Sequence, residues 1–165
     1  MAAPVHLRRL AEADRPAIER HLLTLGAAGR RARFHQAYKD AAIAAYVRRL
    51  DFGRMILFGA VARDGGAIVG MAEAHLDDPR APGAAELAVS ILRGWRNRGL
   101  ARRLVDRAAA QAFTRGAQRA VLNFQPDNPG MAGLVASLAT ALGPRLRRAF
   151  GQATVLPAGE PQPVG

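Results

Sequence analysis

Residues 91–101 read ILRGWRNRGLA, and they lie between two segments with clear patterns. The preceding run, AELAVSIL (85–92), is apolar and rich in residues that favour β-strands. The following run, ARRLVDRAAAQAF (101–113), places apolar residues at helical spacing. The stretch therefore joins a predicted strand to a predicted helix, and its glycines and arginines need a physical reason.

The start of this helix, at Gly99, is suited to bind an anion. The first backbone N–H groups of a helix lack partners, and the helix dipole leaves them partly positive, so a diphosphate fits there. Gly99 allows a ligand to approach the backbone closely. Arg96, Arg98 and Arg102 add positive charge, and each guanidinium can donate two hydrogen bonds to one phosphate. Neither GxxxxGK[ST] nor GxGxxG is present, and any strand-to-helix turn can carry such residues. The stretch thus favours a diphosphate site.

Strand and helix patterns alternate along most of the chain. Strands are predicted at 5–10, 55–63, 67–76, 86–92, 119–125 and 153–157, and helices at about 15–25, 40–50, 99–115 and 131–142. The segment 26–38, GAAGRRARFHQAY, is basic and shows no clear period. This order predicts a mixed α/β fold, with helices flanking a partly antiparallel central sheet.

The length and the turn signals define the organisation of the chain. With 165 residues it is expected to form one domain over 1–157, followed by a disordered Pro/Gly-rich tail at 158–165. Asp64-Gly65-Gly66 predicts a hairpin turn, and 77–83, which contains prolines and a glycine, predicts a loop.

Composition limits the classes of function. The net charge of +11 invites a nucleic-acid interpretation, but the arginines are spread from Arg8 to Arg148 and few aromatic residues are present for base stacking. The absence of cysteine excludes disulfides and thiolate metal sites, and the histidines lack metal-ligand spacing, so no metal is expected. No apolar run reaches the ~20 residues of a membrane span, and no secretory signal is visible. We therefore expect a cytoplasmic protein with no membrane association.

In this context the chain resembles the GNAT superfamily of N-acetyltransferases. The acyl-CoA motif of that family, [QR]-x-x-G-x-[GA], follows a strand and opens a helix, and it is matched by Arg96, Gly99 and Ala101. A second family signal is an asparagine before a helix, matched by Asn128 in NFQPDNPGMAGLVASL. RF at 33–34 and N-x-x-M are also similar to the acyltransferase domain of bacterial protein-lysine acetyltransferases.

The resemblance implies a GNAT-like acyl-CoA N-acyltransferase fold and acetyl-CoA as the co-substrate. The diphosphate would lie on backbone amides of the loop, and the pantetheine arm would pair with the strand edge near Ile91, as an added strand does. Asn128 would contact the cofactor from the end of the next strand. The residues expected to bind acetyl-CoA are Ile91, Arg96, Asn97, Arg98, Gly99, Leu100, Ala101, Arg102 and Asn128.

Acetyl transfer to an amine requires a proton acceptor, because a lysine-like ammonium has a pKa near 10.4. The first candidate is Glu86, on the strand where many members of the family carry a catalytic glutamate. Its apolar neighbours would desolvate it and raise its pKa, whereas the alternative is a glutamate that ends a strand in solvent. Glu73 and His75 share one face of the preceding strand and are further candidates for a proton path or a cationic-substrate site.

One position departs from the family pattern. Many members have a tyrosine seven residues after the asparagine, as a general acid to the CoA thiolate, and this chain has Val135 there. Its two tyrosines, Tyr38 and Tyr46, lie far away in the sequence.

The sequence predicts an N-acetyltransferase that moves an acetyl group from acetyl-CoA to a primary amine, either a protein lysine or a small amine. Glu86 would be the general base of a direct attack. A non-catalytic acyl-CoA-binding sensor is the alternative, and a basic nucleic-acid-associated protein is a lesser one. Whether the chain forms a homodimer is left open.

Overall fold

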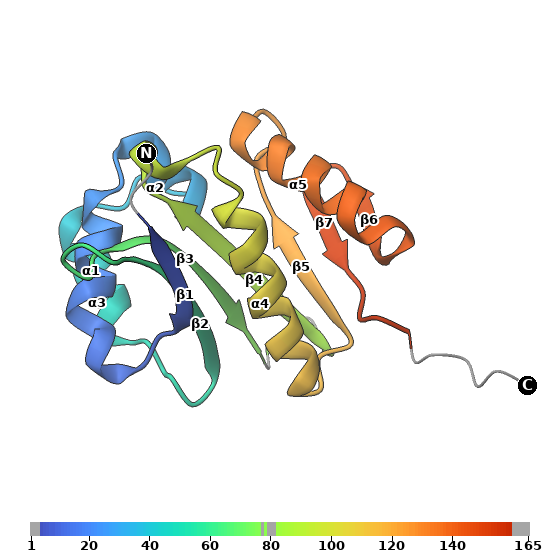
Figure 1. The fold of residues 1–165 in the computed structure, drawn as a ribbon, viewed down its shortest axis with the longest axis horizontal. Helices are drawn as coiled ribbons and strands as arrows, with labels where there is room; N and C mark the ends of the chain where they lie inside the picture. Colours follow the sequence, from blue (N-terminus) through green and yellow to red (C-terminus); the bar gives the residue numbers. More distant parts are fainter. Residues whose placement is uncertain (1–3, 77, 79–81, 160–165) are drawn as a thin grey trace, which may run out of the picture.

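In the part of the chain that the structure describes, residues 4–76, 78 and 82–159, seven strands form one mixed sheet with helices against both faces (Figure 1). The structure is a computed structural model. The strands are β1 (Val5–Arg9), β2 (Met55–Ala62), β3 (Ile68–His75), β4 (Ala84–Ile91), β5 (Arg119–Asn123), β6 (Leu146–Ala149) and β7 (Gln152–Val155). The α-helices are α1 (Arg15–Thr24), α2 (Ala27–Phe34), α3 (Asp40–Arg48), α4 (Leu100–Thr114) and α5 (Pro129–Leu142). Short 3₁₀ turns lie at Glu12–Asp14, Arg93–Trp95 and Gly143–Arg145.

The predicted mixed α/β fold is confirmed, and the predicted strands and helices are all present, with ends that differ by one or two residues. Two elements, α2 and β6, were not predicted. Of the expected loop at 77–83, residues 77 and 79–81 lie outside the described residues, as do 160–165 of the expected tail. Within the described ranges, no helix combines the length and the apolar character needed to cross a membrane.

The strand pairing opens a gap in the middle of the sheet. The strands run in the order β1-β2-β3-β4-β5-β7-β6, and β4–β5 is the parallel pair because α4 crosses over between these two strands. The pairing of β4 with β5 covers Ala84–Leu87 against Arg119–Leu122. Beyond it, β4 continues along β3 to Ile91, while β5 pairs onward with β7. Among the described residues, no strand pairs with the other edge of β4 at 88–91.

Two apolar clusters hold the helices to the two faces of the sheet. Alternate residues of a strand point to opposite faces, so Ile56 of β2 belongs to the cluster that contains residues of α4 and α5, whereas Leu57 belongs to the cluster that contains residues of α1 and α3. We call these the α4 face and the α1–α3 face. The α4 face includes Leu104 and Leu138, and the α1–α3 face includes Ile18 and Ile43, all with no exposed area.

Candidate functional site

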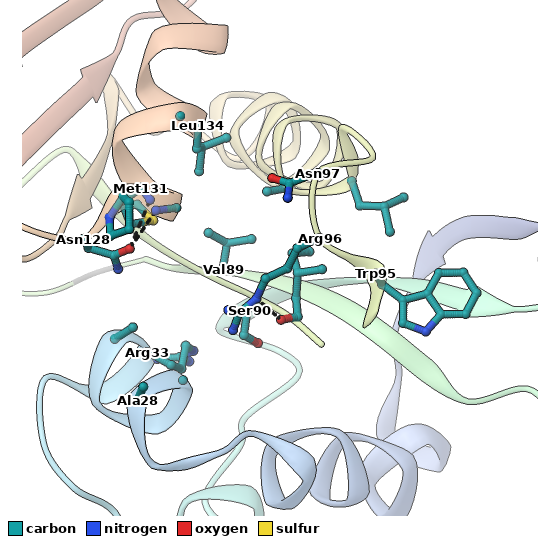
Figure 2. A pocket seen from close by; sticks show the side chains of 18 of the residues that line it. Ala28, Arg33, Val89, Ser90, Trp95, Arg96, Asn97, Asn128, Met131 and Leu134 are labelled. Carbon is teal, nitrogen blue, oxygen red and sulfur yellow. Dashed lines mark hydrogen bonds between the residues drawn. The ribbon is translucent and has the colours of Figure 1, made fainter. Parts of the chain in front are cut away.

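A cavity of about 730 Å³ opens where β4 and β5 diverge (Figure 2). Its wall comes from α2, the end of β4, the loop before α4 and the first turns of α4 and α5. Eight of the nine residues expected to bind acetyl-CoA line it: Ile91, Arg96, Asn97, Gly99, Leu100, Ala101, Arg102 and Asn128. The ninth, Arg98, lies over the ring of Trp95 at 4.9 Å and donates to the Gly94 carbonyl.

The loop before α4 has the backbone geometry of an anion site. Gly99 is the N-cap of α4 with φ 71°, a left-handed conformation that favours glycine, and, apart from its chain neighbours, nothing in the described part of the chain lies within 4 Å of the position that a Cβ would take. Asn97 is also left-handed, with φ 60°. Arg96 Nε donates to the Ile91 carbonyl oxygen at 3.2 Å, which ties the loop to the end of β4. Trp95 is partly buried and packs against the core of the α4 face.

Asn128 fixes the start of α5 at the other wall of this cavity. Its Oδ1 accepts hydrogen bonds from the backbone N–H groups of Gly130 and Met131, at 3.1 and 3.2 Å. This satisfies two of the first N–H groups of the helix, as an N-cap asparagine does. The predicted contact between Asn128 and the cofactor stays a prediction.

A second cavity, of about 420 Å³, adjoins the first. Residues that line both are Ala32, Arg33, Val89 and Met131. Glu86 and His75 both line the second cavity, and they are register partners on the neighbouring strands β4 and β3. Glu86 is exposed, so its predicted desolvation is wrong. The physical reason is that α2 and α3 cover Glu73, while the row of His75 and Glu86 stays open to solvent.

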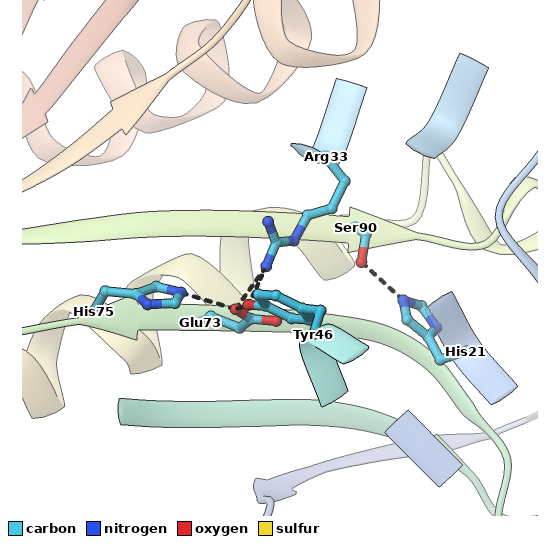
Figure 3. A network of polar contacts seen from close by, with 6 residues as sticks. All are labelled: His21, Arg33, Tyr46, Glu73, His75 and Ser90. Atoms are coloured by element: carbon cyan, nitrogen blue, oxygen red, sulfur yellow. Dashed lines mark hydrogen bonds and ion pairs between the residues drawn. The ribbon is translucent and has the colours of Figure 1, made fainter. Parts of the chain in front are cut away.

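Beside this cavity, Glu73 is at the centre of a buried polar network (Figure 3). Its side chain has no exposed area, and its Oε2 accepts from Arg33 at 2.6 Å, from His75 Nε2 at 2.9 Å and from the Tyr46 hydroxyl. Burial acts to raise the pKa of Glu73, but the charge of Arg33 and the hydrogen bonds from His75 and Tyr46 lower it to about 2. The carboxylate is therefore ionised at neutral pH.

The partners of Glu73 keep their protons. Burial and the nearby carboxylate raise the pKa of Tyr46 far above its ordinary value, so its hydroxyl remains a donor. Burial acts against the charge of Arg33, yet Glu73 raises the pKa of its guanidinium overall. The side chain of Arg33 is 8% exposed.

A second polar contact on the same face joins α1 to the sheet. The ring of His21 is buried, with Nδ1 3.0 Å from the Ile68 carbonyl oxygen and Nε2 2.8 Å from the Ser90 hydroxyl (Figure 3). Burial lowers the pKa of His21 to about 4, so the imidazole is neutral at pH 7. Since a carbonyl can only accept, Nδ1 donates to Ile68 and Nε2 accepts from Ser90.

Sequence reasoning missed several of these residues. It did not predict that His21, Arg33 and Tyr46 lie at the site, although the RF pair at 33–34, which is similar to the family, pointed to Arg33. Val135, at the tyrosine position of the family, is buried in the core of the α4 face. Tyr46 instead reaches the second cavity from α3. Within the described ranges, no three histidine, aspartate or glutamate side chains gather as metal ligands.

The family model "Acetyltransferase (GNAT) family" matches residues 28–138, which is more than half of the chain. The chain belongs to the GNAT acetyltransferase family. It is therefore an acyl-CoA-dependent acetyltransferase with acetyl-CoA as co-substrate, which confirms the resemblance and favours the enzyme over the sensor and the nucleic-acid alternatives. No curated protein matches the chain significantly.

Solved structures of GNAT proteins share the fold. The GNAT domain of S. lividans PAT has a TM-score of 0.72 and 20% identity, with 92% of this chain and 88% of that domain covered. An N-acetyltransferase from Staphylococcus aureus Mu50 has a TM-score of 0.66 and 13% identity, with 92% and 94% covered. The yncA protein of Salmonella typhimurium, solved with its cofactor acetyl-CoA, has a TM-score of 0.65 and 18% identity, with 98% and 99% covered.

Proposed function

We propose that this GNAT protein transfers the acetyl group of acetyl-CoA to a primary amine by direct attack, with Glu86 as the general base. The acceptor is a protein lysine or a small amine. The observation that supports this most is the pair of adjoining cavities at β4, one beside the helix start at Gly99 and the other beside Glu86. A cytoplasmic location stays a prediction.

The first cavity has the groups that acetyl-CoA would need. The backbone at Gly99 leaves open space before the first N–H groups of α4, and Arg96 and Arg102 line the same cavity as cations for phosphate. The edge of β4 at 88–91, which pairs with no described strand, offers N–H and C=O groups to an extended amide chain. When bound, acetyl-CoA supplies an activated acetyl thioester.

The second cavity has the charge expected of a site for an ammonium group. Glu86 and Asp78 are among its lining residues, and the charge of Arg33 in its wall is balanced by Glu73. Aromatic side chains of Phe34 and Tyr46 give apolar surface for the carbon chain of the amine. A carboxylate that lines the cavity can accept the proton that an ammonium must lose before its lone pair attacks.

The test of Glu86 is the substitution Glu86→Gln, which keeps the shape and removes the basicity. We expect kcat to fall about 10²-fold or more, since this is the usual contribution of a general base. Acetyl-CoA affinity measured by calorimetry should stay close to that of the wild type, because Glu86 does not line the first cavity.

Glu19→Gln is the matched control, because it removes the same charge from α1, which lines neither cavity. CoA release should be followed with a panel of amines and lysine peptides. A Glu86→Gln enzyme that acetylates within a few-fold of the wild type would rule out this role for Glu86.

The overall charge predicts the kind of molecule that carries the amine. A protein of net charge +11 repels a small polycation at long range, although the cavity itself accepts one ammonium group. We therefore expect kcat/KM to be higher for a lysine peptide with acidic flanks than for the same peptide with basic flanks. The difference should shrink as salt screens the charges. Efficient spermidine acetylation that improves at low salt would contradict this expectation.

A further inference from the structure

We propose that His75 is a second catalytic proton acceptor, and that its Nδ1 takes a proton from the acceptor amine while Glu73 acts as a positioning residue. This inference rests on the proposed function and adds a second proton-accepting group to it. It follows from the placement of His75 on the sheet, from its bond to Glu73 and from the number of protons that the reaction releases.

His75 and Glu86 are placed to act on the same nitrogen atom. They are register partners on β3 and β4, so they share one face of the sheet, with Cβ atoms about 4.5–5.5 Å apart as in other directly opposed pairs. Both line the second cavity. The side chain of His75 is 36% exposed, so the imidazole can exchange protons with solvent.

The bond to Glu73 determines which nitrogen of His75 is the base. Nε2 lies 2.9 Å from Oε2 of Glu73, whose ionised carboxylate can only accept, so Nε2 carries the hydrogen. Nδ1 of the neutral ring is then the proton acceptor. Arg33 and Tyr46 bind the same oxygen of Glu73, and they hold the carboxylate that orients the ring (Figure 3).

Amide formation removes two protons from the ammonium group, so each of two proton acceptors can take one. An ammonium group, RNH₃⁺, loses one proton before its lone pair forms the C–N bond, and it loses a second as the C–S bond breaks and the amide forms. One of the two protons ends on the sulfur of CoA and the other ends in solvent. Glu86 takes the first proton and releases it to solvent, whereas His75 takes the second and passes it to the CoA thiolate that leaves as the C–S bond breaks.

Charged and titratable groups face His75 from several of the elements that line the second cavity. Carboxylates face it from its own strand and from the next one, at Glu73 and Glu86, and Asp78 lines the same cavity. Arg33 from α2 is the nearby fixed cation, and it is paired with Glu73. Two further titratable groups line this cavity, His35 at the end of α2 and Tyr46 on α3.

The kinetic test is His75→Gln, because a glutamine amide can still donate to Glu73 but cannot accept a proton. We expect kcat to fall about 10- to 100-fold and KM for acetyl-CoA to stay unchanged. The rise in rate between pH 5 and 8, where a histidine changes charge, should weaken in the variant. His6→Gln, at an exposed position of β1, is the matched control and should behave as the wild type.

A His75→Gln enzyme within two-fold of the wild type and with the same pH profile would overturn the inference and leave the role of Glu86 standing. A wild type that turns over no amine in the panel would overturn both.

A second measurement needs neither substrate nor turnover. Long-range ¹H–¹⁵N NMR of the free protein at pH 7.5 reports which ring nitrogen carries hydrogen. We expect Nε2–H for His75 and the opposite tautomer, Nδ1–H, for His21, with His75→Gln and His21→Gln spectra to assign the signals. An Nδ1–H tautomer for His75 would overturn the inference even if Glu86→Gln behaves as predicted.

Discussion

The two faces of the central sheet use the same strands in opposite ways. On the α4 face, buried alanine, leucine and valine side chains pack against α4 and α5. On the α1–α3 face, the apolar cluster is interrupted by the described polar residues that are most buried, His21, Glu73 and Ser90. The face that only supports the loop before α4 is apolar, whereas the face beside the second cavity contains ionised and hydrogen-bonded groups. Stability alone would not favour the second arrangement, because burying a charge is costly.

Some polar atoms of the α1–α3 face are not satisfied by the protein. Among the described residues, Glu73 Oε1 and Arg33 Nε are buried with no hydrogen-bond partner. An unsatisfied buried group costs on the order of 1–3 kcal/mol, so this network is held together mainly by the charges of Arg33 and Glu73.

The largest effect is expected from Arg33→Met. It leaves the carboxylate of Glu73 buried without its cation, which should lower the free energy of unfolding by about 3–5 kcal/mol. Denaturant unfolding measures this loss. Adding Glu73→Leu should restore most of it, because the buried charge is then absent.

Arg31→Met is the control for this experiment, since Arg31 is exposed on the same helix and should change stability by about 0.5 kcal/mol or less. If Arg33→Met costs no more than the control, the ion pair does not hold α2 to the sheet.

The next effect is a loss of stability in acid that comes from His21. Its pKa is lowered from 6.5 to about 4 because the folded state buries the neutral ring, so the contribution is complete above about pH 6.5. It is lost as the pH falls toward 4, by up to about 3 kcal/mol. Glu73, with a pKa of about 2, adds its own loss mainly below pH 4.5. His21→Gln should flatten the profile between pH 6.5 and 4 by about that amount.

Leu104→Ala on the apolar face is the contrast to His21. It should cost about 3 kcal/mol at every pH, because it creates a cavity and changes no titrating group. Urea unfolding at several pH values compares the two variants. A wild-type stability that is constant from pH 7 to 4 would mean that His21 is not buried as a neutral ring.

The smallest effect is expected from Ser90→Ala, which removes the donor to His21 Nε2. The free energy of unfolding should fall by about 1 kcal/mol, the usual net value of one hydrogen bond. The variant should unfold in one cooperative transition, with α1 still packed through Ile18 and Leu22. An unchanged or increased stability would show that the hydroxyl contributes nothing to the attachment of α1.

The sequence was sufficient for the elements with strong periodicity and insufficient for those without it. Strands such as β2 and β3, and the motif from β4 into α4, were predicted closely because burial imposes a period on their residues. Helix α2 was missed because Gly29 and three arginines interrupt any apolar stripe, and it packs through Arg33 and through Phe34 at its end. Strand β6 was missed because three of its four residues, 147–149, are exposed, so burial imposes no alternation of apolar residues on it.

The candidate site divides in the same way. The loop residues around Gly99 are contiguous, so a motif can reveal them. Arg33 and Glu73 are 40 positions apart in the sequence. No local pattern predicts that α2, which shows no clear apolar period, places the guanidinium of Arg33 against the carboxylate of Glu73. The exposure of Glu86 depends on where α2 and α3 end, and the residues of its own strand do not determine this.

The free edge of β4 at 88–91 has a consequence for aggregation. An edge with unpaired N–H and C=O groups normally invites a strand of another protein molecule, and proteins blunt such edges with charges, bulges or short strands. Here the edge lies inside the sheet, between β3 and the diverging β5, and residues of α2 and α5 line the cavity beside it. A strand from another folded domain would have to displace these helices, while a thin, flexible molecule needs only the width of the cavity. The fold thus keeps a site for β-type hydrogen bonding within the molecule while shielding it from pairing between molecules.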